Sequence, residues 1–472
     1  MTIDRSTVRG WLNRVRARFG HDYRAYGANG SRPSPAPDSL RCNIEAAYTA
    51  DGRHVLVTGW AEDICKAQLF FHDEPYGQST RLDPVLIPRD DVAGHLTTVG
   101  RPATTNMHGF TAVLQRQTVG TNVRLSVDDG NGWSKISSGF QFEASQVSLR
   151  ELLGMALKAA RQGGGDVARD FSRLARAMVT DVPPAPAVAS VRTFGPPDGV
   201  ATRPPRISIV IPFYGDGFYL LDHLIAQRRA PDDVEWIVVC DDPRLAETLT
   251  QTIVHRQSMI RQPTSIVYLG VNGGFAHANN IGASHARGKY VLLMNSDVYC
   301  RDFSFIRSAC DLMEQDAGIG CVGFTLRFED GTIQHDGMSF TRAPWFDNLW
   351  ASDHLGKGMA YNCAAASHVE VDAVTAALML LRRDDFADSR IFDPGYVIGD
   401  FEDADLCLRL REQGKAILLV RSGGIYHLER QSVRTMADDE SRRAITLLNC
   451  LRFNARWGPA LEQRAQSAKS AT

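Results

Sequence analysis

The stretch Lys289-Tyr-Val-Leu-Leu-Met-Asn-Ser-Asp-Val298 decides the fold of this chain. Its run Tyr290–Met294 is apolar throughout, which is typical of a strand buried on both faces of a parallel sheet. The small polar residues Asn295, Ser296 and Asp297 follow at once. Ligands bind at the carboxyl ends of strands in open α/β sheets, and a carboxylate there can hold a divalent cation against a phosphate. We therefore expect the ligand site of an α/β domain at this point.

Similar apolar runs come before this stretch and alternate with helical segments. We expect strands at residues 207–213, 235–240 and 265–269, and helices at residues 219–228, 244–256 and 273–288. This alternation predicts a mostly parallel, Rossmann-like sheet with right-handed crossovers.

Polar residues at the ends of these strands are candidates for binding a nucleotide. An acidic residue after the second strand can accept hydrogen bonds from a base or a ribose, and paired glycines let backbone amides approach a ligand closely. The alternative is that an aspartate at a strand end only caps the next helix. The candidate nucleotide-binding residues are Pro212, Tyr214, Asp241, Asn272, Gly273, Gly274, Asn279, Asn295 and Ser296.

The composition limits the classes of protein to consider. At 472 residues the chain is long enough for two or three domains. A formal charge of -2 gives no reason to expect nucleic acid as a partner. The nine cysteines are scattered without a CxxC pair, so neither a zinc site nor a disulfide framework is expected. No apolar stretch reaches the ~20 residues that span a bilayer, and the N-terminus lacks the pattern of a signal peptide. We expect a cytoplasmic protein.

Changes in texture along the chain predict its domains. We expect a basic amphipathic helix and flexible linker at 1–39, an antiparallel β-sandwich at 40–146, a helical and proline-rich linker at 147–205, the α/β domain at 206–435, and a C-terminal helix and tail at 436–472. The first, arginine-rich helix can lie peripherally on an anionic membrane surface. The alternative is a helix docked on its own protein with a solvated arginine face.

Five motifs of the chain resemble those of a known family. They are IVIPFY (209–214), VVCDD (238–242), NGGFAHANNIGASHARGKYVLLMNSDV (272–298), DGTIQHDGM (330–338) and GDFEDADLCLRLREQGKAILLV (399–420). In this order they resemble a family 2 glycosyltransferase with the GT-A fold, in particular the bacterial rhamnosyltransferase-like members that build surface polysaccharides. The resemblance covers residues 206–430 and leaves out the N-terminal sandwich.

The resemblance implies a donor site and a metal site. Asp241 matches the acidic position that contacts the nucleotide base, and Asn295–Asp297 falls on the family's metal-binding DxD motif. Because the first position is Asn, Asp297 is expected to be the main carboxylate ligand to Mg²⁺ or Mn²⁺. His427 matches a further metal ligand or a contact to the diphosphate; the alternative is a hydrogen-bonded structural histidine.

Glu402-Asp403 matches the family's ED motif, which implies the catalytic base. An acceptor hydroxyl is a poor nucleophile, so a carboxylate must take its proton as it attacks the anomeric carbon. Asp403 is the expected base of an inverting reaction, with Glu402 or Asp400 as the fallback. The alternative is that these acids only favour a helix N-terminus, since a helix is expected at 401–413.

The segments 330–337 and 371–377, which lie between the metal motif and the ED motif, are expected to line the acceptor side. Asp336, Gly337 and Trp345 are the candidates, although Trp345 can equally be a core residue. In the segment 371–377 the family usually has a glycine where this chain has Ala376-Ala377. The local backbone conformation there is therefore expected to differ from that of the family.

The resemblance thus implies an inverting glycosyltransferase that uses a nucleoside-diphosphate sugar and a divalent cation. Its acceptor would be a growing bacterial surface glycan, a polysaccharide or lipopolysaccharide, either free or lipid-linked. A sugar-phosphate nucleotidyltransferase is less favoured, because residues 212–216 after the first strand contain no basic residue. A catalytically silent glycan-binding protein is the alternative from another class. Asn295 favours that alternative, and the acids Asp241, Asp297 and Asp403 count against it.

Overall fold

The computed structural model of the chain describes residues 42–61, 68–73, 78–98, 105–115, 122–128, 142–180, 187–195, 204–215, 233–301, 303–346, 348–362, 367–386, 390–421, 423–428 and 439–471. The predicted arginine-rich helix in 1–39 and the helix predicted at 219–228 lie outside these residues.

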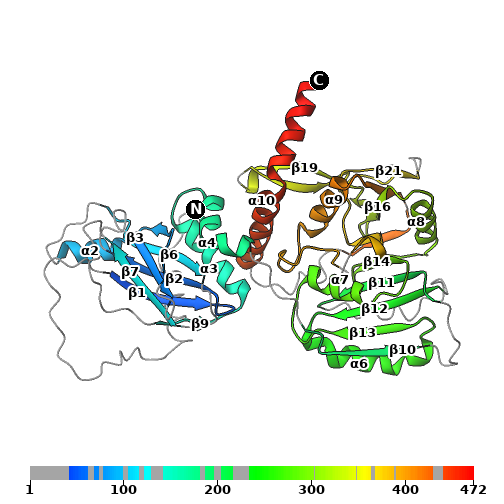
Figure 1. The fold of residues 1–472 in the computed structure, drawn as a ribbon, viewed down its shortest axis with the longest axis horizontal. Coiled ribbons are helices and arrows are strands. Elements are labelled where there is room, and N and C mark those ends of the chain that lie inside the picture. The colour runs from blue at the N-terminus through cyan, green and yellow to red at the C-terminus, as the bar shows by residue number, and fades with distance from the viewer. Residues whose placement is uncertain are drawn as a thin grey trace. The chain divides into compact units, whose positions relative to one another are not determined.

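A nine-stranded sheet forms the centre of the α/β region, in the order β10-β13-β12-β11-β14-β22-β16-β23-β21 (Figure 1). Its strands are β10 (Ser190–Phe194), β11 (Ile207–Phe213), β12 (Val234–Cys240), β13 (Thr264–Tyr268), β14 (Tyr290–Met294), β16 (Ile319–Phe324), β21 (His368–Glu370), β22 (Leu378–Arg382) and β23 (Ala416–Val420). Strands β13, β12, β11 and β14 are parallel neighbours. All residues of β12 and β14 are buried. The predicted α/β fold with a parallel core is confirmed.

Three strands of this sheet depart from the parallel pattern, and one of them is β21, which pairs antiparallel with β23. Strand β22 runs antiparallel between β14 and β16. Strand β10 pairs antiparallel with β13 at the edge of the sheet. Residues 190–194 lie in the region expected to be a linker, but this short run contains no proline or glycine and carries β-branched residues, which suits an edge strand.

Helices and smaller strands surround the sheet. The helices are α6 (Ala246–His255), α7 (Phe275–Ser284), α8 (Ser304–Gln315) and α9 (Glu402–Glu412), and the short 3₁₀ turns are η1 (Pro243–Leu245), η2 (Gln257–Met259), η3 (Pro344–Phe346) and η4 (Arg383–Asp385). A four-stranded sheet has the order β15-β24-β17-β18, formed by Val298–Cys300, Ile425–His427, Leu326–Arg327 and Ile333–His335. Strands β19 (Met338–Ala343) and β20 (Leu349–His354) form a hairpin.

Helix α7 lies against β11 and β12 at unusually short range. A Cβ atom added to Gly282 would lie 2.3 Å from Cγ1 of Val210 and 3.0 Å from Cγ2 of Val239. The absence of a side chain at this position therefore permits the close contact between helix and sheet. This packing holds the C-terminal turn of α7, the helix that follows the Gly273-Gly274 loop, against the sheet.

The N-terminal part is β-rich, as expected. Its elements are β1 (Cys42–Thr49), β2 (His54–Ala61), β3 (Gln68–Asp73), β4 (Gln78–Arg81), β5 (Val85–Ile87), α2 (Asp90–Thr98), β6 (Gly109–Gln115), β7 (Asn122–Asp128), β8 (Phe142–Glu143) and β9 (Ser145–Gln146). They form sheets of order β5-β6-β2-β1-β9 and β4-β3-β7-β8, antiparallel except for the β1–β9 pair. The bounds of the predicted sandwich domain stay a prediction.

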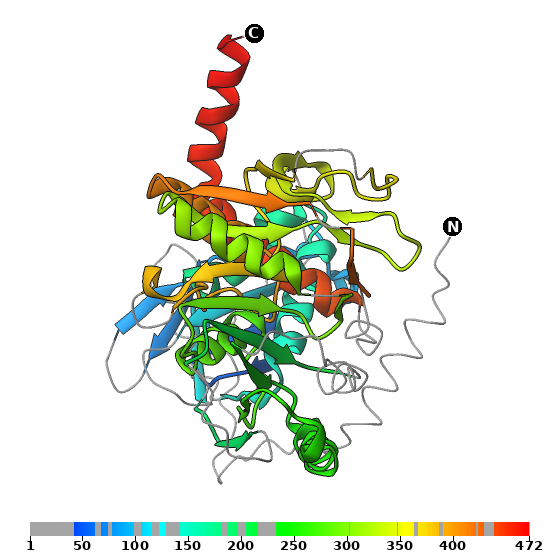
Figure 2. The ribbon, with the colours of Figure 1, turned by 90° about the vertical axis from the view of Figure 1, so that its right-hand side faces the viewer.

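Three further helices form a common apolar cluster. Helices α3 (Leu149–Gln162) and α4 (Val167–Thr180) occupy the predicted helical linker, and α10 spans Asp439–Ala471. Leu152, Phe171 and Leu448, one from each helix, are buried in this cluster. Both views show the C-terminal end of α10 extending away from the rest of the described chain (Figures 1 and 2). The predicted C-terminal tail is therefore helical as far as Ala471.

Candidate functional site

Asp297 and His427 lie together at the carboxyl end of β14. Strand β15 begins at Val298, which pairs with His427 of β24, and the backbone N–H of Leu428 donates to the carbonyl of Asp297 at 2.9 Å. This short ladder places the imidazole Nε2 of His427 3.0 Å from Oδ1 of Asp297. The two side chains are only 11% and 10% exposed. We call this pair the cation corner.

The donor atoms at the cation corner fit a hard divalent cation. Such an ion binds its ligands at about 2.1 Å in octahedral geometry, which puts neighbouring ligand atoms roughly 3 Å apart, as Oδ1 and Nε2 are. Asn295 adds an amide whose Nδ2 lies 3.5 Å from Nε2 of His427. Its Oδ1 is buried without a hydrogen-bond partner among the described residues.

The cation corner supplies few charged ligands. Within the described ranges, no group of three or more His, Cys, Asp or Glu side chains gathers to hold a metal. Mg²⁺ is usually held by one or two carboxylates together with water and substrate phosphates. Asp297, His427 and Asn295 therefore suit a cation that is shared with a phosphorylated ligand.

Asp241 joins the ends of two strands on the other side of β11. Its Oδ1 accepts from the N–H of Gly273 at 2.6 Å, and its Oδ2 accepts from the N–H of Gly274 at 3.0 Å. Burial raises the pKa of Asp241 to about 7, although both N–H donors lower it. Asn272 also accepts from Gly274, through Oδ1 at 3.1 Å. The carboxylate thus shapes the glycine loop that was expected to receive a nucleotide.

The neighbouring acid, Asp242, has the capping role. It accepts from the backbone N–H of Arg244 at 3.1 Å, and it also pairs with the guanidinium of Arg244 at 2.6 Å. That guanidinium lies 5.9 Å from the ring centroid of Tyr214. The capping alternative therefore describes Asp242, whereas Asp241 links two loops.

The other donor-side candidates take different positions. Pro212 belongs to β11 and Ser296 is buried directly before Asp297. Asn279 is fully buried in α7, where Nδ2 donates to the carbonyl of Phe275 at 2.9 Å. Its Oδ1 has no partner in the part of the chain that the structure describes.

Asp403 lies in the first turn of α9, held by backbone N–H groups. Its Oδ2 accepts from Ala376 at 3.2 Å and its Oδ1 from Ala404 at 2.7 Å. Burial raises the pKa of Asp403 above its usual value, while these donors lower it. We call Asp403 and Glu402 the base corner.

Glu402 has a more apolar environment than Asp403. It is 5% exposed, and its Oε2 is buried without a partner among the residues described. Burial, followed by the charges of Asp403 and Asp400, raises the pKa of Glu402 well above its usual range. Burial thus raises the pKa of both acids of the base corner.

The backbone before α9 is strained. Ile398, Asp400 and Phe401 have φ angles of 63°, 86° and 74°, a region that costs energy for residues other than glycine, most of all for a β-branched one. The carbonyl of Ile398 accepts from the N–H of Phe275 at 2.6 Å. A Cβ on Gly274 would lie 2.8 Å from Cα of Ile398. Strain of this kind clusters at functional sites, and the sequence analysis did not predict it.

The loops described above converge. The N–H of Asn295 donates to the carbonyl of Ala377 at 2.8 Å, and the N–H of Ala376 donates to Asp403. The segment 375–377 therefore joins the cation corner to the base corner. The Gly274 loop contacts the strained segment on the other side of Asp403. Residues that are distant in sequence meet around one set of loops.

Comparison with known proteins assigns part of the chain to a family. Residues 208–375 match the family described as Glycosyl transferase family 2. This segment is a family 2 glycosyltransferase domain. Asp241 and Asp297 lie inside the matched residues, and Asp403 and His427 lie beyond them.

Relatives of the glycosyltransferase domain include proteins of glycan synthesis. Over 305 residues the chain is 28% identical to the O-antigen biosynthesis protein RfbC of Myxococcus xanthus, covering 61% of this chain and 22% of that protein. Over 131 residues it is 27% identical to TuaG of Bacillus subtilis, named as a teichuronic acid biosynthesis glycosyltransferase, covering 27% of this chain and 50% of TuaG. The chain thus spans no more than half the length of these relatives.

One solved structure gives a weaker comparison. The crystal structure of GalNAc-T7 with UDP, GalNAc and Mn²⁺ aligns with a TM-score of 0.36 at 17% identity, over 51% of this chain and 49% of that one. A similarity this weak has no bearing on the site.

The acceptor-side candidates of the glycosyltransferase domain are engaged within the protein. Asp336 accepts from the hydroxyl of Thr325 at 2.7 Å and pairs with Arg421 at 3.3 Å. Gly337 has a φ of 99°, which favours glycine. Trp345 belongs to η3, and its side chain lies outside the description. The acceptor role of all three stays a prediction.

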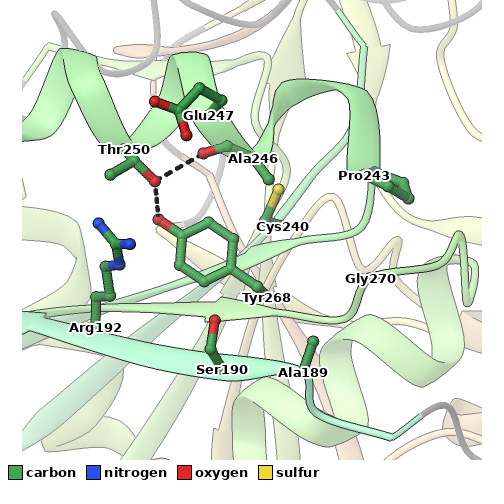
Figure 3. A pocket seen from close by; sticks show the side chains of 10 residues that line it. All are labelled: Ala189, Ser190, Arg192, Cys240, Pro243, Ala246, Glu247, Thr250, Tyr268 and Gly270. Carbon is green, nitrogen blue, oxygen red and sulfur yellow. Dashed lines mark hydrogen bonds between the residues drawn. The ribbon is translucent and has the colours of Figure 1, made fainter.

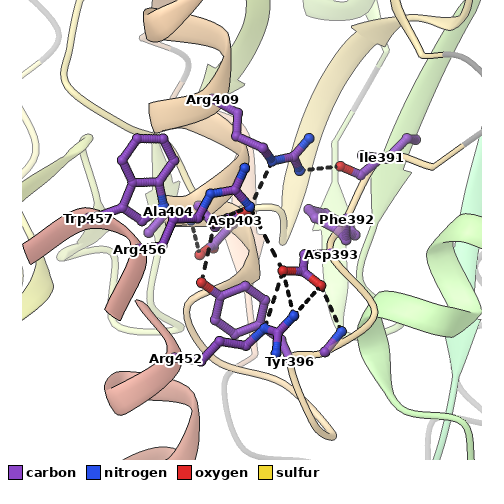
Figure 4. A network of polar contacts seen from close by, with 12 residues as sticks. Ile391, Phe392, Asp393, Tyr396, Asp403, Ala404, Arg409, Arg452, Arg456 and Trp457 are labelled. Carbon is purple, nitrogen blue, oxygen red and sulfur yellow. Dashed lines mark hydrogen bonds and ion pairs between the residues drawn. The ribbon is translucent and has the colours of Figure 1, made fainter. Parts of the chain in front are cut away.

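A polar network holds helix α9 in place (Figure 4). Asp405 accepts from Nε1 of Trp457 at 2.8 Å and from Nε of Arg409 at 2.9 Å. Arg452 of α10 pairs with Asp393 at 2.9 Å. Asp405 is therefore a structural anchor, which separates it from its neighbour Asp403.

A cavity of about 260 Å³ lies beside α6 (Figure 3). It is lined by residues from β10, β13, α6 and the end of β12, and Oγ1 of Thr250 lies 2.6 Å from the hydroxyl of Tyr268 there. The lining does not include the predicted donor residues, so this cavity adds nothing to the candidate site.

Proposed function

We propose that the chain is an inverting, cation-assisted glycosyltransferase that moves a sugar from a nucleoside-diphosphate sugar to a hydroxyl of a bacterial surface glycan. The observation that carries the proposal is the connection through 375–377, since it brings a cation-binding pair and a buried carboxylate base to one set of loops. Asp241 and the Gly273-Gly274 loop form the donor side in this proposal.

Each group has a distinct part in the reaction. Asp241, which holds the Gly273-Gly274 loop, receives the nucleotide base. Asp403 takes the proton of the acceptor hydroxyl as its oxygen attacks the anomeric carbon, on the face opposite the departing nucleoside diphosphate. Asp297, His427 and Asn295 would hold a divalent cation, which would supply Lewis-acid stabilisation of the leaving diphosphate.

The names of two relatives support the proposed class of acceptor. RfbC and TuaG are named for O-antigen and teichuronic acid synthesis, so a growing surface polysaccharide, free or lipid-linked, is the proposed acceptor. The described residues include no helix long and apolar enough to cross a membrane. In this proposal a lipid-linked acceptor is met at the membrane surface, where the arginine-rich segment within 1–39 would bind.

A panel of nucleoside-diphosphate sugars tests the proposal. We expect release of nucleoside diphosphate from one of them in the presence of Mn²⁺ or Mg²⁺, with EDTA removing the activity. The same donor should raise the melting temperature by mass action. A protein that binds no nucleotide sugar, or that releases diphosphate equally well in EDTA, contradicts the proposal. Liposome binding of the full chain, compared with a chain lacking residues 1–20, tests the membrane contact.

A further inference from the structure

Gln334 contacts the imidazole of His427 from the side away from Asp297. It lies in β18, within the same small sheet as β24, and is 4% exposed. Its amide Nε2 is 2.8 Å from Nδ1 of His427. Its amide Oε1 is buried and has no partner among the described residues. A buried amide with one half satisfied and the other half unpaired calls for an explanation.

The observed contact fixes one form of the histidine. An amide NH₂ can only donate, so Nδ1 of His427 accepts from Gln334 and the ring proton resides on Nε2. That N–H then donates to Oδ1 of Asp297, 3.0 Å away. In this form Nε2 has no lone pair to offer a cation. The imidazole and the carboxylate satisfy each other instead.

A half-turn of the Gln334 amide produces the opposite form. The turn exchanges Oε1 and Nε2, so that the carbonyl oxygen accepts from Nδ1–H and Nε2 takes the place of the unpaired atom. The lone pair of Nε2 then faces Asp297 and is available to a cation. Asn295 has the matching feature: Nδ2 faces Nε2 of His427 at 3.5 Å, and the unpaired Oδ1 would replace it after a similar turn.

We propose that Gln334 is a positioning residue that selects the tautomer of His427 and thereby opens or closes the cation corner. Glutamine suits this task because one amide can both donate and accept, whereas a carboxylate at the same place can only accept. Residues that orient a metal-binding histidine through its other ring nitrogen change metal affinity by 10–100-fold in other proteins. This inference rests on the proposed cation site, and on none of the donor or acceptor chemistry.

Direct Mn²⁺ binding to the full chain tests the proposal, measured by calorimetry at pH 8 without a sugar donor. Gln334→Leu should weaken binding by about 10–100-fold, because Nδ1–H loses its acceptor. Gln334→Glu should bind as tightly as the wild type or more tightly, since a carboxylate holds the Nδ1–H form. Gln262→Leu replaces another buried glutamine and should leave Mn²⁺ affinity unchanged.

Two outcomes overturn the inference while leaving the glycosyltransferase proposal intact. One is Mn²⁺ affinity that Gln334→Leu does not change. The other is an equal loss in Gln334→Leu and Gln334→Glu, which indicates packing alone. A wild-type chain that binds no Mn²⁺ overturns both this inference and the cation in the proposed function. A second measurement needs no metal: ¹⁵N chemical shifts of His427 should show the Nε2–H form in the free wild type and the Nδ1–H form in Gln334→Glu.

Discussion

The cation corner and the base corner place the same functional group in opposite environments. At the cation corner, Asp297 faces the imidazole of His427 at 3.0 Å. At the base corner, Asp403 accepts from the backbone N–H groups of Ala376 and Ala404, and burial raises its pKa. A carboxylate beside an imidazole is equipped to share a cation. A carboxylate with a raised pKa has greater affinity for a proton.

Environment, rather than residue type, distinguishes the roles proposed for Asp297 and Asp403. Two carboxylates with divergent surroundings are the usual mark of separate duties within one active site. The strained backbone at Ile398–Phe401 belongs to the base corner alone. Substitutions at each corner should separate the two by experiment.

The largest expected effect is at the base corner. Asp403→Asn should lower kcat by roughly 10²–10⁴-fold, because the amide cannot take the acceptor's proton. Donor and Mn²⁺ affinities should remain, since the cation corner is untouched. Glu402→Gln is the matched control and should lower kcat far less. If Glu402→Gln is the more damaging change, the base is assigned to the wrong residue.

The cation corner should respond in the opposite way. Asp297→Ala removes its carboxylate ligand and should weaken Mn²⁺ binding, and with it donor binding, by more than about tenfold. Calorimetry with and without EDTA measures this. Donor affinity that neither EDTA nor the substitution changes would remove the cation from the account.

Acidification should act on the donor side, through Asp241. Because its pKa is raised to about 7, the carboxylate form dominates above that pH and is lost as pH falls below it. The ionised fraction drops about tenfold between pH 8 and pH 6, so donor affinity should fall by a similar factor. Asp241→Asn should bind the donor more weakly and without this pH dependence. A wild-type profile that is flat from pH 8 to pH 6 would contradict the role.

The smallest effect concerns the contact between Gly274 and Ile398. Gly274→Ala places a methyl group 2.8 Å from the Ile398 backbone at a φ of 83°, so it should lower the free energy of unfolding by more than about 1 kcal/mol and weaken donor binding. Gly414→Ala is the matched control, with a φ of 74° and open space around it. Equal effects in urea unfolding would show that backbone strain alone, and no contact between loops, is responsible.

Much of the fold could be predicted because the buried strands are continuous apolar runs. The expected strands at 207–213 and 265–269 agree with β11 and β13 to within one residue at each end. Edge strand β10 was not predicted, since an edge strand needs little apolar surface and its pairing with β13 depends on tertiary structure.

The site was predicted less completely than the fold. The motifs pointed to Asp241, Asp297, Asp403 and His427 as candidates, and all four lie at or near the ends of regular elements. Gln334 was missed, although it stands beside residues assigned to the acceptor side. Gln334 and His427 are 93 residues apart in the chain. No local sequence pattern predicts such a contact. The strain at Ile398 was equally invisible, because a β-branched residue is not expected at a positive φ.

A crystal of the chain soaked with Mn²⁺ and a nucleoside diphosphate tests the central claim most directly. The anomalous difference map should place Mn²⁺ between Oδ1 of Asp297 and Nε2 of His427, with the diphosphate bound to it on the side that faces Asp403. Mn²⁺ at any other position, or a diphosphate on a surface that Asp403 does not share, would contradict the account.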